Sequence, residues 1–327
     1  MKKVLFLRKK TNGENSIEEL AKTLLNGIPD LELAIFPGYC NSITGMVHNI
    51  LFAIKHQGDI NHFMDIASCF VAPFIKGKKI VTHHDMGTLF KTRNRIFRWI
   101  KKNLMYPLSL HFVDVIVCIT NFTKTETLHT YPNIAKKTRV IYNSYNKSIK
   151  YTEHTFKENY PTILHIGTAK RKNLLQVIKA LQNIPCKLNI VGNLNNEQLE
   201  ALNENKIDYI QEQDVPFERI IELYKECDLV TFPSFYEGFG MPVIEAQVTG
   251  RPIIITRLAS LPEIAGDSAC FVDPNDYRSI RNEILKIIHN KSHREQIIVD
   301  GIANAKRFST EKMIESYKSL YASLSQN

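Results

Sequence analysis

Residues 232–246 read FPSFYEGFGMPVIEA and form the most informative segment of the sequence. An apolar segment ends near Phe232, a Gly-x-Gly loop follows, and Pro242 stands where the first turn of a helix tolerates proline. Gly238 and Gly240 let the backbone approach a ligand closely, and a helix start adds unpaired N–H donors with a positive dipole end. The stretch therefore predicts a strand–loop–helix edge that binds the oxygen atoms of a ligand.

Two carboxylates flank this loop. Glu237 precedes the glycines, and Glu245 lies about one turn into the predicted helix. Helical side chains tilt toward the N-terminus, so Glu245 can lean back over the same crevice. A carboxylate in such a position is a natural partner for a ribose diol, and the second can accept hydrogen bonds from the other end of a ligand. The alternative is that Glu237 only caps the loop and Glu245 is a surface residue of the helix.

A second cluster is found at residues 164–174, LHIGTAKRKNL. An apolar strand runs into Gly167, three cations follow (Lys170, Arg171 and Lys172), and an apolar-periodic helix comes next. Cations at the carboxyl end of a parallel strand, beside a helix start, predict a pyrophosphate-binding turn. The alternative is an exposed basic turn. Because both clusters follow strands of one predicted sheet, where α/β proteins bind ligands, we favour a shared site.

Short apolar runs alternate with helix-length amphipathic stretches along the whole chain, which predicts an α/β fold with parallel sheets covered on both faces. The expected strands are residues 4–7, 31–36, 80–82, 115–119 and 139–142 in the first half, and residues 162–166, 187–191, 208–210, 229–232, 253–256 and 270–272 in the second.

The 327 residues suit two domains. The strand pattern restarts after residues 143–160, a polar stretch without apolar periodicity. We therefore expect one domain over residues 1–150 and a second over residues 151–309. Residues 310–325 have the pattern of an amphipathic helix, which we expect to pack back on the first domain.

Composition narrows the class of protein. With 44% hydrophobic and 23% charged residues, the chain resembles soluble globular proteins, and no apolar run approaches the ~20 residues that span a bilayer. The six cysteines show no metal-type spacing, which favours buried, reduced thiols in the cytoplasm. The turn after the first strand contains one glycine, Gly13, instead of GxGxxG, which disfavours a nicotinamide dehydrogenase.

The net charge of +9 is concentrated in the first half. Residues 1–150 hold 22 basic and 10 acidic residues, whereas the remainder holds 20 and 23, so the first half carries +12 and the second −3. An anionic partner of the first half is expected, and a membrane surface, a phosphorylated lipid or a nucleic acid are the candidates. Nucleic acid is disfavoured because no helix-turn-helix, zinc or RNA-binding motif is present.

Part of this charge lies in residues 91–102, KTRNRIFRWIKK. Such a basic amphipathic segment can lie on an anionic membrane face. The alternative is a solvated helix that packs its aromatic side chains inward. The residues of the predicted membrane or acceptor surface are Lys91, Arg93, Arg95, Arg98, Trp99, Lys101 and Lys102.

The sequence resembles the family 4 retaining glycosyltransferases of GT-B fold. Their Glu-x7-Glu signature is matched by Glu237 and Glu245 in EGFGMPVIEA, and the likeness continues through residues 250–252, 261–266 and 272–274. The resemblance implies two Rossmann-like parallel-sheet domains facing a central cleft. It also implies a hexosyltransferase (EC 2.4) that uses a nucleotide-sugar donor and a glycan or lipid-linked acceptor. With such an acceptor, the enzyme is expected in the cytoplasm, bound peripherally to the cytoplasmic face of the membrane.

The resemblance also implies roles for single residues. Glu245 would bind the ribose, Arg171 and Lys172 the diphosphate, and Glu237 the transferred sugar. In Thr82-His83-His84-Asp85, a His-Asp motif of the family places His84 and Asp85 near the anomeric centre, with His83 as the alternative to His84. The remaining donor contacts would come from Gly13, Gly167, Gly192, Val215, Gly238, Phe239, Gly240 and Met241.

No Asp-x-Asp occurs in the chain, so the usual carboxylate anchor of a metal-bound diphosphate is missing. We therefore expect no required divalent metal and no cofactor besides the nucleotide-sugar substrate. The turn after Gly167 departs from the family, since it is short and Thr168 stands where many members carry arginine. A non-catalytic sugar-nucleotide-binding subunit, an epimerase and a phosphorylase of the same fold are the alternative functions.

Overall fold

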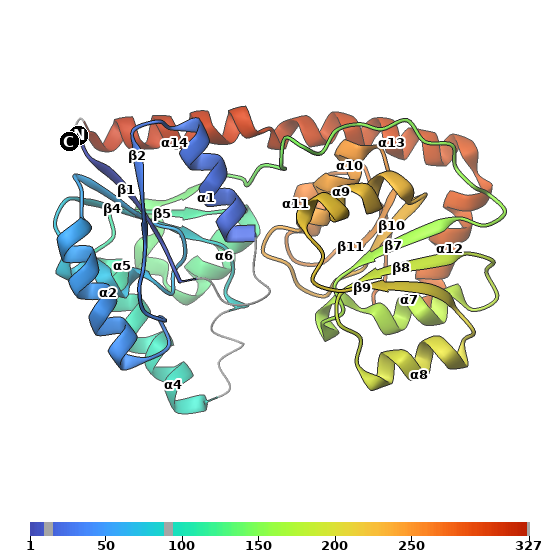
Figure 1. Cartoon of the computed structure of the whole chain (residues 1–327), viewed down its shortest axis with the longest axis horizontal. Coiled ribbons are helices and arrows are strands. Elements are labelled where there is room, and N and C mark those ends of the chain that lie inside the picture. The colour runs from blue at the N-terminus through green and yellow to red at the C-terminus, as the bar shows by residue number, and fades with distance from the viewer. Residues whose placement is uncertain (10–15, 88–93, 326–327) are drawn as a thin grey trace. The chain divides into compact units, whose positions relative to one another are not determined.

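The computed structural model of the protein describes residues 1–9, 16–87 and 94–325. The chain divides into two compact units (Figure 1). The first comprises Met1–Asn146 with Thr310–Asn327, and the second comprises Lys147–Ser309. The C-terminal segment therefore belongs to the same unit as the N-terminus.

The N-terminal unit is built on a six-stranded parallel sheet of order β2-β1-β3-β4-β5-β6. Its strands are β1 (Lys3–Leu7), β2 (Leu31–Ile35), β3 (Ile60–Phe63), β4 (Lys78–His83), β5 (Val115–Cys118) and β6 (Thr138–Val140). The helical elements are α1 (Ser16–Gly27), α2 (Ile43–His56), η1 (Cys69–Phe74), α4 (Arg95–Ile100), η2 (Lys101–Met105), α5 (Tyr106–His111), α6 (Asn121–Thr130), η3 (Pro132–Lys137) and α14 (Thr310–Ser325).

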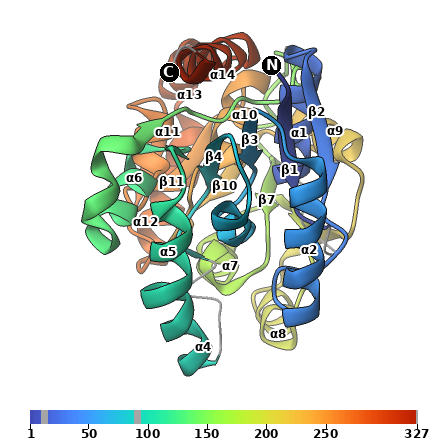
Figure 2. The same cartoon turned by 90° about the vertical axis from the view of Figure 1, so that its left-hand side faces the viewer.

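Helices cover both faces at the centre of this sheet, and successive strand residues point alternately into two cores. In β1, Val4 and Phe6 belong to a core with η1 and α5, whereas Leu5 and Leu7 belong to a second core with α1 and α14. Figure 2 shows the strands of this sheet between these two sets of helices. Burial on both faces explains why β1 and β5 appear in the sequence as nearly continuous apolar runs.

Strand β3 was missed by the sequence prediction, because its sequence INHF has two polar residues at its centre. Both are fully buried and hydrogen-bonded. Asn61 bonds the backbone of Gly58 and Lys76, and His62 lies 2.8 Å from the Thr82 hydroxyl and 2.7 Å from the Tyr321 hydroxyl. The strand is thus stabilised by polar contacts that an apolar pattern does not reveal.

The contact between His62 and Tyr321 also holds helix α14 on the sheet. Tyr317 extends the network, since its hydroxyl lies 3.1 Å from the Thr82 hydroxyl. Met313, Tyr317 and Tyr321 are all buried in the core that α14 shares with α1. Burial lowers the pKa of His62 to about 3, so the imidazole is neutral and exchanges neutral hydrogen bonds with its partners.

The C-terminal unit contains a second parallel sheet, of order β12-β11-β10-β7-β8-β9. Its strands are β7 (Thr162–Ile166), β8 (Lys187–Val191), β9 (Asp208–Glu212), β10 (Leu229–Phe232), β11 (Ile253–Thr256) and β12 (Cys270–Val272). The helical elements are η4 (Lys170–Lys172), α7 (Leu174–Leu181), α8 (Asn196–Glu204), α9 (Phe217–Glu226), α10 (Met241–Thr249), α11 (Leu261–Ala265), α12 (Tyr277–His289), α13 (Lys291–Ala305) and η5 (Lys306–Phe308).

This strand order reverses between β7 and β10, which are neighbours in the sheet although β8 and β9 separate them in the sequence. The crossover connections on either side of such a switch point run to opposite faces, so the loops after β7 and β10 diverge and leave a crevice at the carboxyl ends of the strands. Both sequence clusters, residues 164–174 and 232–246, lie at this crevice. None of the helices in the described part of the chain is long and apolar enough to cross a membrane.

The docking of α14 gives a first prediction. Tyr321→Phe should raise the hydrogen-exchange rates of α14 amides about 5- to 100-fold, because an unpaired buried polar atom costs ~1–3 kcal/mol. Hydrogen exchange followed by mass spectrometry measures the effect. The control is Tyr39→Phe, since Tyr39 is 46% exposed in the same unit. Equal exchange of α14 in the two variants would contradict the role of the buried network.

Candidate functional site

The turn after β7 places its cations through two unusual backbone positions. Gly167 has φ 94°, a left-handed conformation that favours glycine, and a Cβ atom there would also press against the Lys172 side chain at 3.0 Å. The short helix η4 then carries Lys170, Arg171 and Lys172. Asn173 ends it with φ 66°, and its amide donates to the Pro274 carbonyl over 2.8 Å. The turn is thus fixed before α7 begins.

The loop after β10 is also held by its backbone conformation and by hydrogen bonds. Gly240 precedes α10 with φ 96°, and a Cβ atom there would lie 2.7 Å from Leu261. The Ser260 hydroxyl lies 2.9 Å from the carbonyl oxygens of Glu237 and Phe239. The Phe239 side chain is itself only 4% exposed, so a ligand meets the backbone of this loop more readily than that ring.

Two cations of the first turn bind one oxygen of Glu237. Lys172 Nζ lies 2.7 Å and Arg171 Nη1 lies 2.6 Å from Glu237 Oε1. Arg171 also donates to the Tyr236 carbonyl over 2.9 Å, and its own carbonyl accepts from the Phe235 N–H over 2.8 Å. The turn after β7 and the loop after β10 are therefore joined across the switch point by charge-assisted bonds.

Burial differs between the two cations. The Lys172 side chain is 13% exposed and its ammonium lies 4.2 Å from the centre of the Phe232 ring, whereas Arg171 is 40% exposed. Burial lowers the pKa of Lys172, and the adjacent Glu237 carboxylate opposes that shift. A desolvated ammonium next to a carboxylate interacts strongly with any further anion, because few water molecules screen it.

Glu245 belongs to the same cluster and is not a surface residue of its helix. It is 7% exposed, and its Oε2 accepts a hydrogen bond from the Tyr224 hydroxyl over 2.8 Å. Burial raises the pKa of Glu245 to about 7, while the Tyr224 hydrogen bond and the charge of Lys172 act in the opposite direction. The charge of Lys172 acts on both glutamates of the Glu-x7-Glu signature. The alternative that Glu245 is a surface residue of the helix is wrong.

The other predicted donor residues surround this cluster at the same edge of the sheet. Gly192 follows β8, and its carbonyl accepts from the Gln211 amide over 2.9 Å. Thr168 donates to the Asn193 carbonyl over 2.6 Å, which ties the turn after β7 to the turn after β8. Val215 and Met241 are partly exposed at the starts of α9 and α10. Their roles toward a ligand stay predictions.

In the N-terminal unit, the two histidines at the end of β4 differ clearly. His83 is 1% exposed, and its Nε2 contacts the Met86 sulfur at 3.3 Å. His84 is partly buried, and its Nε2 lies 2.8 Å from the Met64 carbonyl. A carbonyl only accepts, so Nε2 of His84 carries the proton and Nδ1 keeps a lone pair. Burial lowers the pKa of His84, which favours this neutral form. Asp85 accepts from the Gly87 N–H over 2.7 Å and shapes the following turn.

Sequence reasoning did not find two acidic or phenolic partners of these groups. Asp65 follows β3, is 5% exposed, and lies 4.0 Å from Arg8 at the end of β1. Its charge acts on His84. Asp65 was not recognised as a site residue because strand β3, which precedes it, was not predicted from the sequence. Tyr224 was given no role, because a tyrosine on the amphipathic helix α9 is typical of a core residue.

The predicted basic surface is partly described. Gly13, Lys91 and Arg93 lie outside the described residues. In α4 no residue is buried, and Trp99 is 64% exposed, so this tryptophan does not pack inward, whereas Phe97 is partly exposed. The cations Arg95, Arg98, Lys101 and Lys102 lie along the same helical segment, and Lys101 Nζ covers the Phe97 ring at 4.8 Å.

The fold and this crevice define a class: a two-unit α/β protein with GT-B architecture. Structural neighbours agree. Anabaena HepE in complex with UDP and glucose superposes with a TM-score of 0.82 at 15% identity, over 99% of this chain and 100% of that one. WaaG, a glycosyltransferase involved in lipopolysaccharide biosynthesis, gives 0.74 at 14% identity over 97% and 99% of the two chains.

Sequence comparison identifies the family. Residues 146–303 match the family described as Glycosyl transferases group 1, and residues 13–148 match Glycosyltransferase Family 4. The O-antigen chain mannosyltransferase B of Escherichia coli is 28% identical over 77% of this chain and 73% of its own length. The O-antigen chain mannosyltransferase RfbU of Salmonella typhimurium is 26% identical over 66% of this chain and 62% of its own length. The chain belongs to the family 4 glycosyltransferases, and it is an enzyme that transfers sugar.

The buried state of Glu245 gives a second prediction. Its pKa is raised on folding, so the folded protein holds an extra proton between about pH 4.5 and 7 and loses stability as the pH rises through that window. Glu245→Gln removes this loss and keeps an oxygen for Tyr224. The free energy of unfolding of the variant should exceed that of the wild type by up to ~3 kcal/mol above pH 7.

Urea denaturation at several pH values measures this difference. Glu200→Gln, on the exposed side of α8, controls for the loss of one acidic group. A difference between Glu245→Gln and the wild type that does not change from pH 4.5 to 8 would show that Glu245 is not desolvated as described.

Proposed function

We propose that this enzyme transfers a hexose, with retention of anomeric configuration and without a metal ion, from a nucleoside-diphosphate sugar to a glycan or lipid-linked acceptor. The observation that carries the proposal is the cluster at the β7–β10 switch point. Lys172 and Arg171 share one oxygen of Glu237 there, and Glu245 lies beside Lys172. Each group matches one part of a nucleotide sugar.

The cations match the diphosphate. Arg171 and Lys172 carry two positive charges against the single charge of Glu237, so the turn keeps an excess of positive charge. Sugar transfer releases a nucleoside diphosphate, and negative charge grows on the phosphate oxygen that leaves. Donors already held in place meet that charge without reorganisation, which is where such groups lower a barrier most.

The two carboxylates match the hydroxyl-rich ends of the donor. Glu245 would accept hydrogen bonds from the ribose hydroxyls, as acidic residues do in dinucleotide folds. Its pKa of about 7 means that hydroxyl donors from a ligand would favour the ionised form and lower that value. Glu237, released from part of its contact with the cations by the diphosphate, would bind hydroxyls of the transferred sugar.

By the family resemblance, His84 would contact the transferred sugar. Its Nε2 proton is committed to the Met64 carbonyl, so Nδ1 would face the ligand as an acceptor. This favours His84 over His83, whose ring is buried against Met86. Same-face attack by the acceptor, with His84 shaping the sugar site, is the retaining route that the family resemblance implies. That the two units face one cleft stays a prediction.

Two relatives are named O-antigen chain mannosyltransferases, so mannose is the first sugar to test and a growing surface polysaccharide the first acceptor. Metal independence rests on the chain itself, because the diphosphate partners are Arg171 and Lys172 and no Asp-x-Asp occurs. Activity should therefore be unchanged by EDTA at a temperature where the protein is stable.

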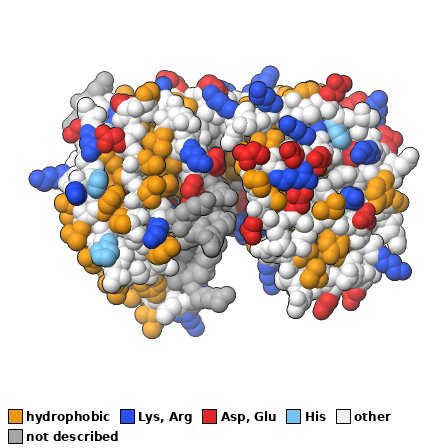
Figure 3. All heavy atoms as spheres, in the orientation of Figure 1, with side chains coloured by type: hydrophobic (Ala, Val, Ile, Leu, Met, Phe, Trp, Pro, Cys, Tyr) orange, Lys and Arg blue, Asp and Glu red, His pale blue; other side chains and the backbone are white. Residues whose placement is uncertain are grey.

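A membrane-borne acceptor is supported by the surface of the N-terminal unit. Helix α2 exposes Ile43, Val47, Leu51 and Ile54 along one stripe, at 83, 50, 61 and 44% exposure. Figure 3 shows hydrophobic side chains gathered on this side of the unit. Helices α4 and α5 add Ile96, Trp99 and Leu108, beside the cations of α4. Large exposed apolar surface next to basic residues favours the interface of an anionic bilayer.

The donor site gives a third prediction. Lys172→Met keeps the apolar stem and removes the charge, so kcat should fall about 10²- to 10³-fold in an assay with the best donor. That donor is first chosen by thermal shift from UDP-, GDP-, ADP- and dTDP-sugars, since a ligand of the native state raises its stability. Product analysis also separates a transferase from an epimerase, which needs no acceptor, and from a phosphorylase, which needs phosphate.

The control is Lys170→Met in the same run of three cations, because Lys170 is exposed. Its kcat should stay within about twofold of the wild type, since surface charges contribute little. Equal losses in both variants would refute a specific role of Lys172, and no turnover in the wild type with any donor would favour a non-catalytic subunit.

The membrane surface gives a fourth prediction. Vesicles of phosphatidylglycerol should sediment the protein, and phosphatidylcholine vesicles should sediment far less, with the difference lost at high salt. The double variant Val47→Ser, Leu51→Ser should weaken binding by tenfold or more, because each apolar side chain buried in the interface contributes ~1.5–3 kcal/mol. Val299→Ser, 61% exposed in the other unit, is the control. Equal binding to both lipids, or to neither, would contradict the proposal.

A further inference from the structure

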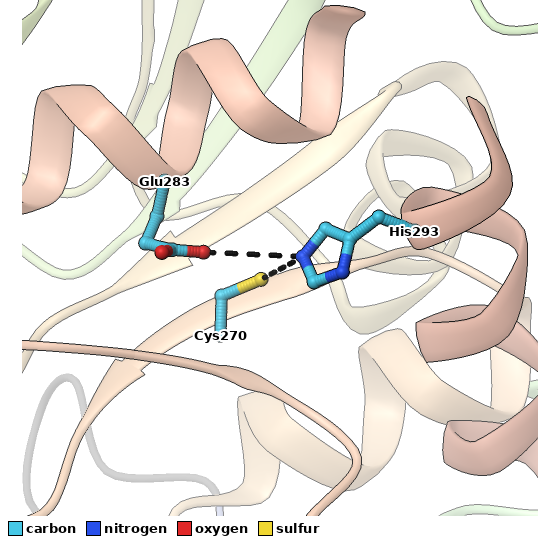
Figure 4. Close-up of side chains that lie close together, drawn as sticks. All are labelled: Cys270, Glu283 and His293. Carbon is cyan, nitrogen blue, oxygen red and sulfur yellow. Dashed lines mark hydrogen bonds and ion pairs between the residues drawn. The ribbon is translucent and has the colours of Figure 1, made fainter. Parts of the chain in front are cut away.

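Cys270, Glu283 and His293 bring three metal-ligand side chains together at the edge strand of the C-terminal sheet. Cys270 begins β12, Glu283 lies on α12, and His293 lies on α13 (Figure 4). Their donor atoms all lie within 4.8 Å of one another. The donor crevice lies at β7 and β10, and β11 separates these strands from β12. The cluster is therefore not part of the crevice.

The separations of the donor atoms agree with a tetrahedral ion. Zinc–sulfur and zinc–nitrogen bonds of about 2.3 and 2.05 Å put sulfur and nitrogen about 3.6 Å apart, and nitrogen and oxygen about 3.4 Å apart. In the structure Cys270 Sγ lies 3.6 Å from His293 Nε2, and Glu283 Oε2 lies 3.9 Å from the same nitrogen. The Glu283 side chain is 25% exposed and can close the remaining few tenths of an ångström by a small rotation.

The arrangement does not fit a catalytic relay. In a thiol–imidazole–carboxylate triad the two ring nitrogens are used separately, one toward the nucleophile and the other toward the acid. Here both Cys270 and Glu283 approach Nε2 of His293, as the two dashed lines in Figure 4 show. One nitrogen carries at most one proton, so it can make a full hydrogen bond to only one of these neighbours at a time. Three donors aimed at one point are explained by a cation between them.

The surroundings suit a divalent ion of intermediate softness. Lys286 Nζ lies 3.8 Å from Glu283 Oε1, the oxygen that does not face His293, and can orient the carboxylate as an outer partner. A thiolate, an imidazole and a carboxylate together select zinc over magnesium or calcium.

We propose that Cys270, Glu283 and His293 bind a zinc ion that fastens α12 and α13 to the edge strand β12 and stabilises the C-terminal unit. The thiol of Cys270 loses its proton to solvent when the ion binds. Three protein donors leave the fourth position of the tetrahedron to a water molecule. The ion has a structural role and takes no part in donor binding, so this proposal does not depend on the proposed function.

The test uses the full-length protein after treatment with a chelator and titration with Co²⁺ or Zn²⁺ alone. Wild-type protein should bind one Co²⁺ with the visible bands of tetrahedral coordination and a thiolate-to-cobalt charge-transfer band. Zn²⁺ should displace it and raise the melting temperature. Cys270→Ala should abolish the charge-transfer band, and Glu283→Gln should weaken binding at least tenfold.

Two matched pairs of variants guard against misfolding and against binding elsewhere. Cys186→Ala replaces another buried cysteine of the same unit and should leave the cobalt spectrum unchanged. His293→Gln should lose binding, whereas His289→Gln, exposed on α12, should keep it. A wild-type protein without a thiolate–cobalt band, or equal zinc binding by His293→Gln and the wild type, would overturn the proposal.

Discussion

The bond between Lys172 and Glu237 is the interaction on which the donor site depends. A single carboxylate oxygen holds a nearly buried ammonium at 2.7 Å and a guanidinium at 2.6 Å, and so joins the turn after β7 to the loop after β10. The strand order makes this possible, because β7 and β10 are neighbours at the point where the order of the parallel strands reverses. Desolvation of Lys172 raises the energy of the unliganded site and leaves a cation that an incoming anion can stabilise.

The sequence predicted this half of the molecule well for physical reasons. Strands β10 and β11 are continuous apolar runs, and β7, β8 and β12 are largely apolar. The edge strand β9 is more polar. The site residues lie in two short segments that combine glycines with charged residues next to strand ends. The burial of Glu245 could not be predicted, because a glutamate in a helix is most often exposed. Its partner Tyr224 lies 21 residues away on α9, and only the fold brings the two together.

The N-terminal unit was harder to predict because its interior contains polar groups. His62 and Asn61 interrupt the apolar pattern of β3, and the partners that satisfy His62 include Tyr321 at the other end of the chain. Asp65 was not predicted to be near the site, because the strand before it was not predicted. The same unit exposes apolar side chains on α2 that a helix of a soluble domain would normally bury. Buried polar side chains and exposed apolar side chains both depart from the usual pattern of an apolar interior and a polar surface. The exposed apolar face of α2 is where we infer contact with a membrane.

The central claim is that Lys172, Glu237 and Glu245 bind opposite ends of one activated sugar. A crystal structure of the protein with an intact nucleoside-diphosphate sugar tests it most directly. The account predicts the diphosphate within hydrogen-bonding distance of Lys172 and Arg171, and a ribose hydroxyl on Glu245. A donor bound elsewhere, with the Lys172–Glu237 bond unchanged and no ligand at the β7–β10 crevice, would contradict it.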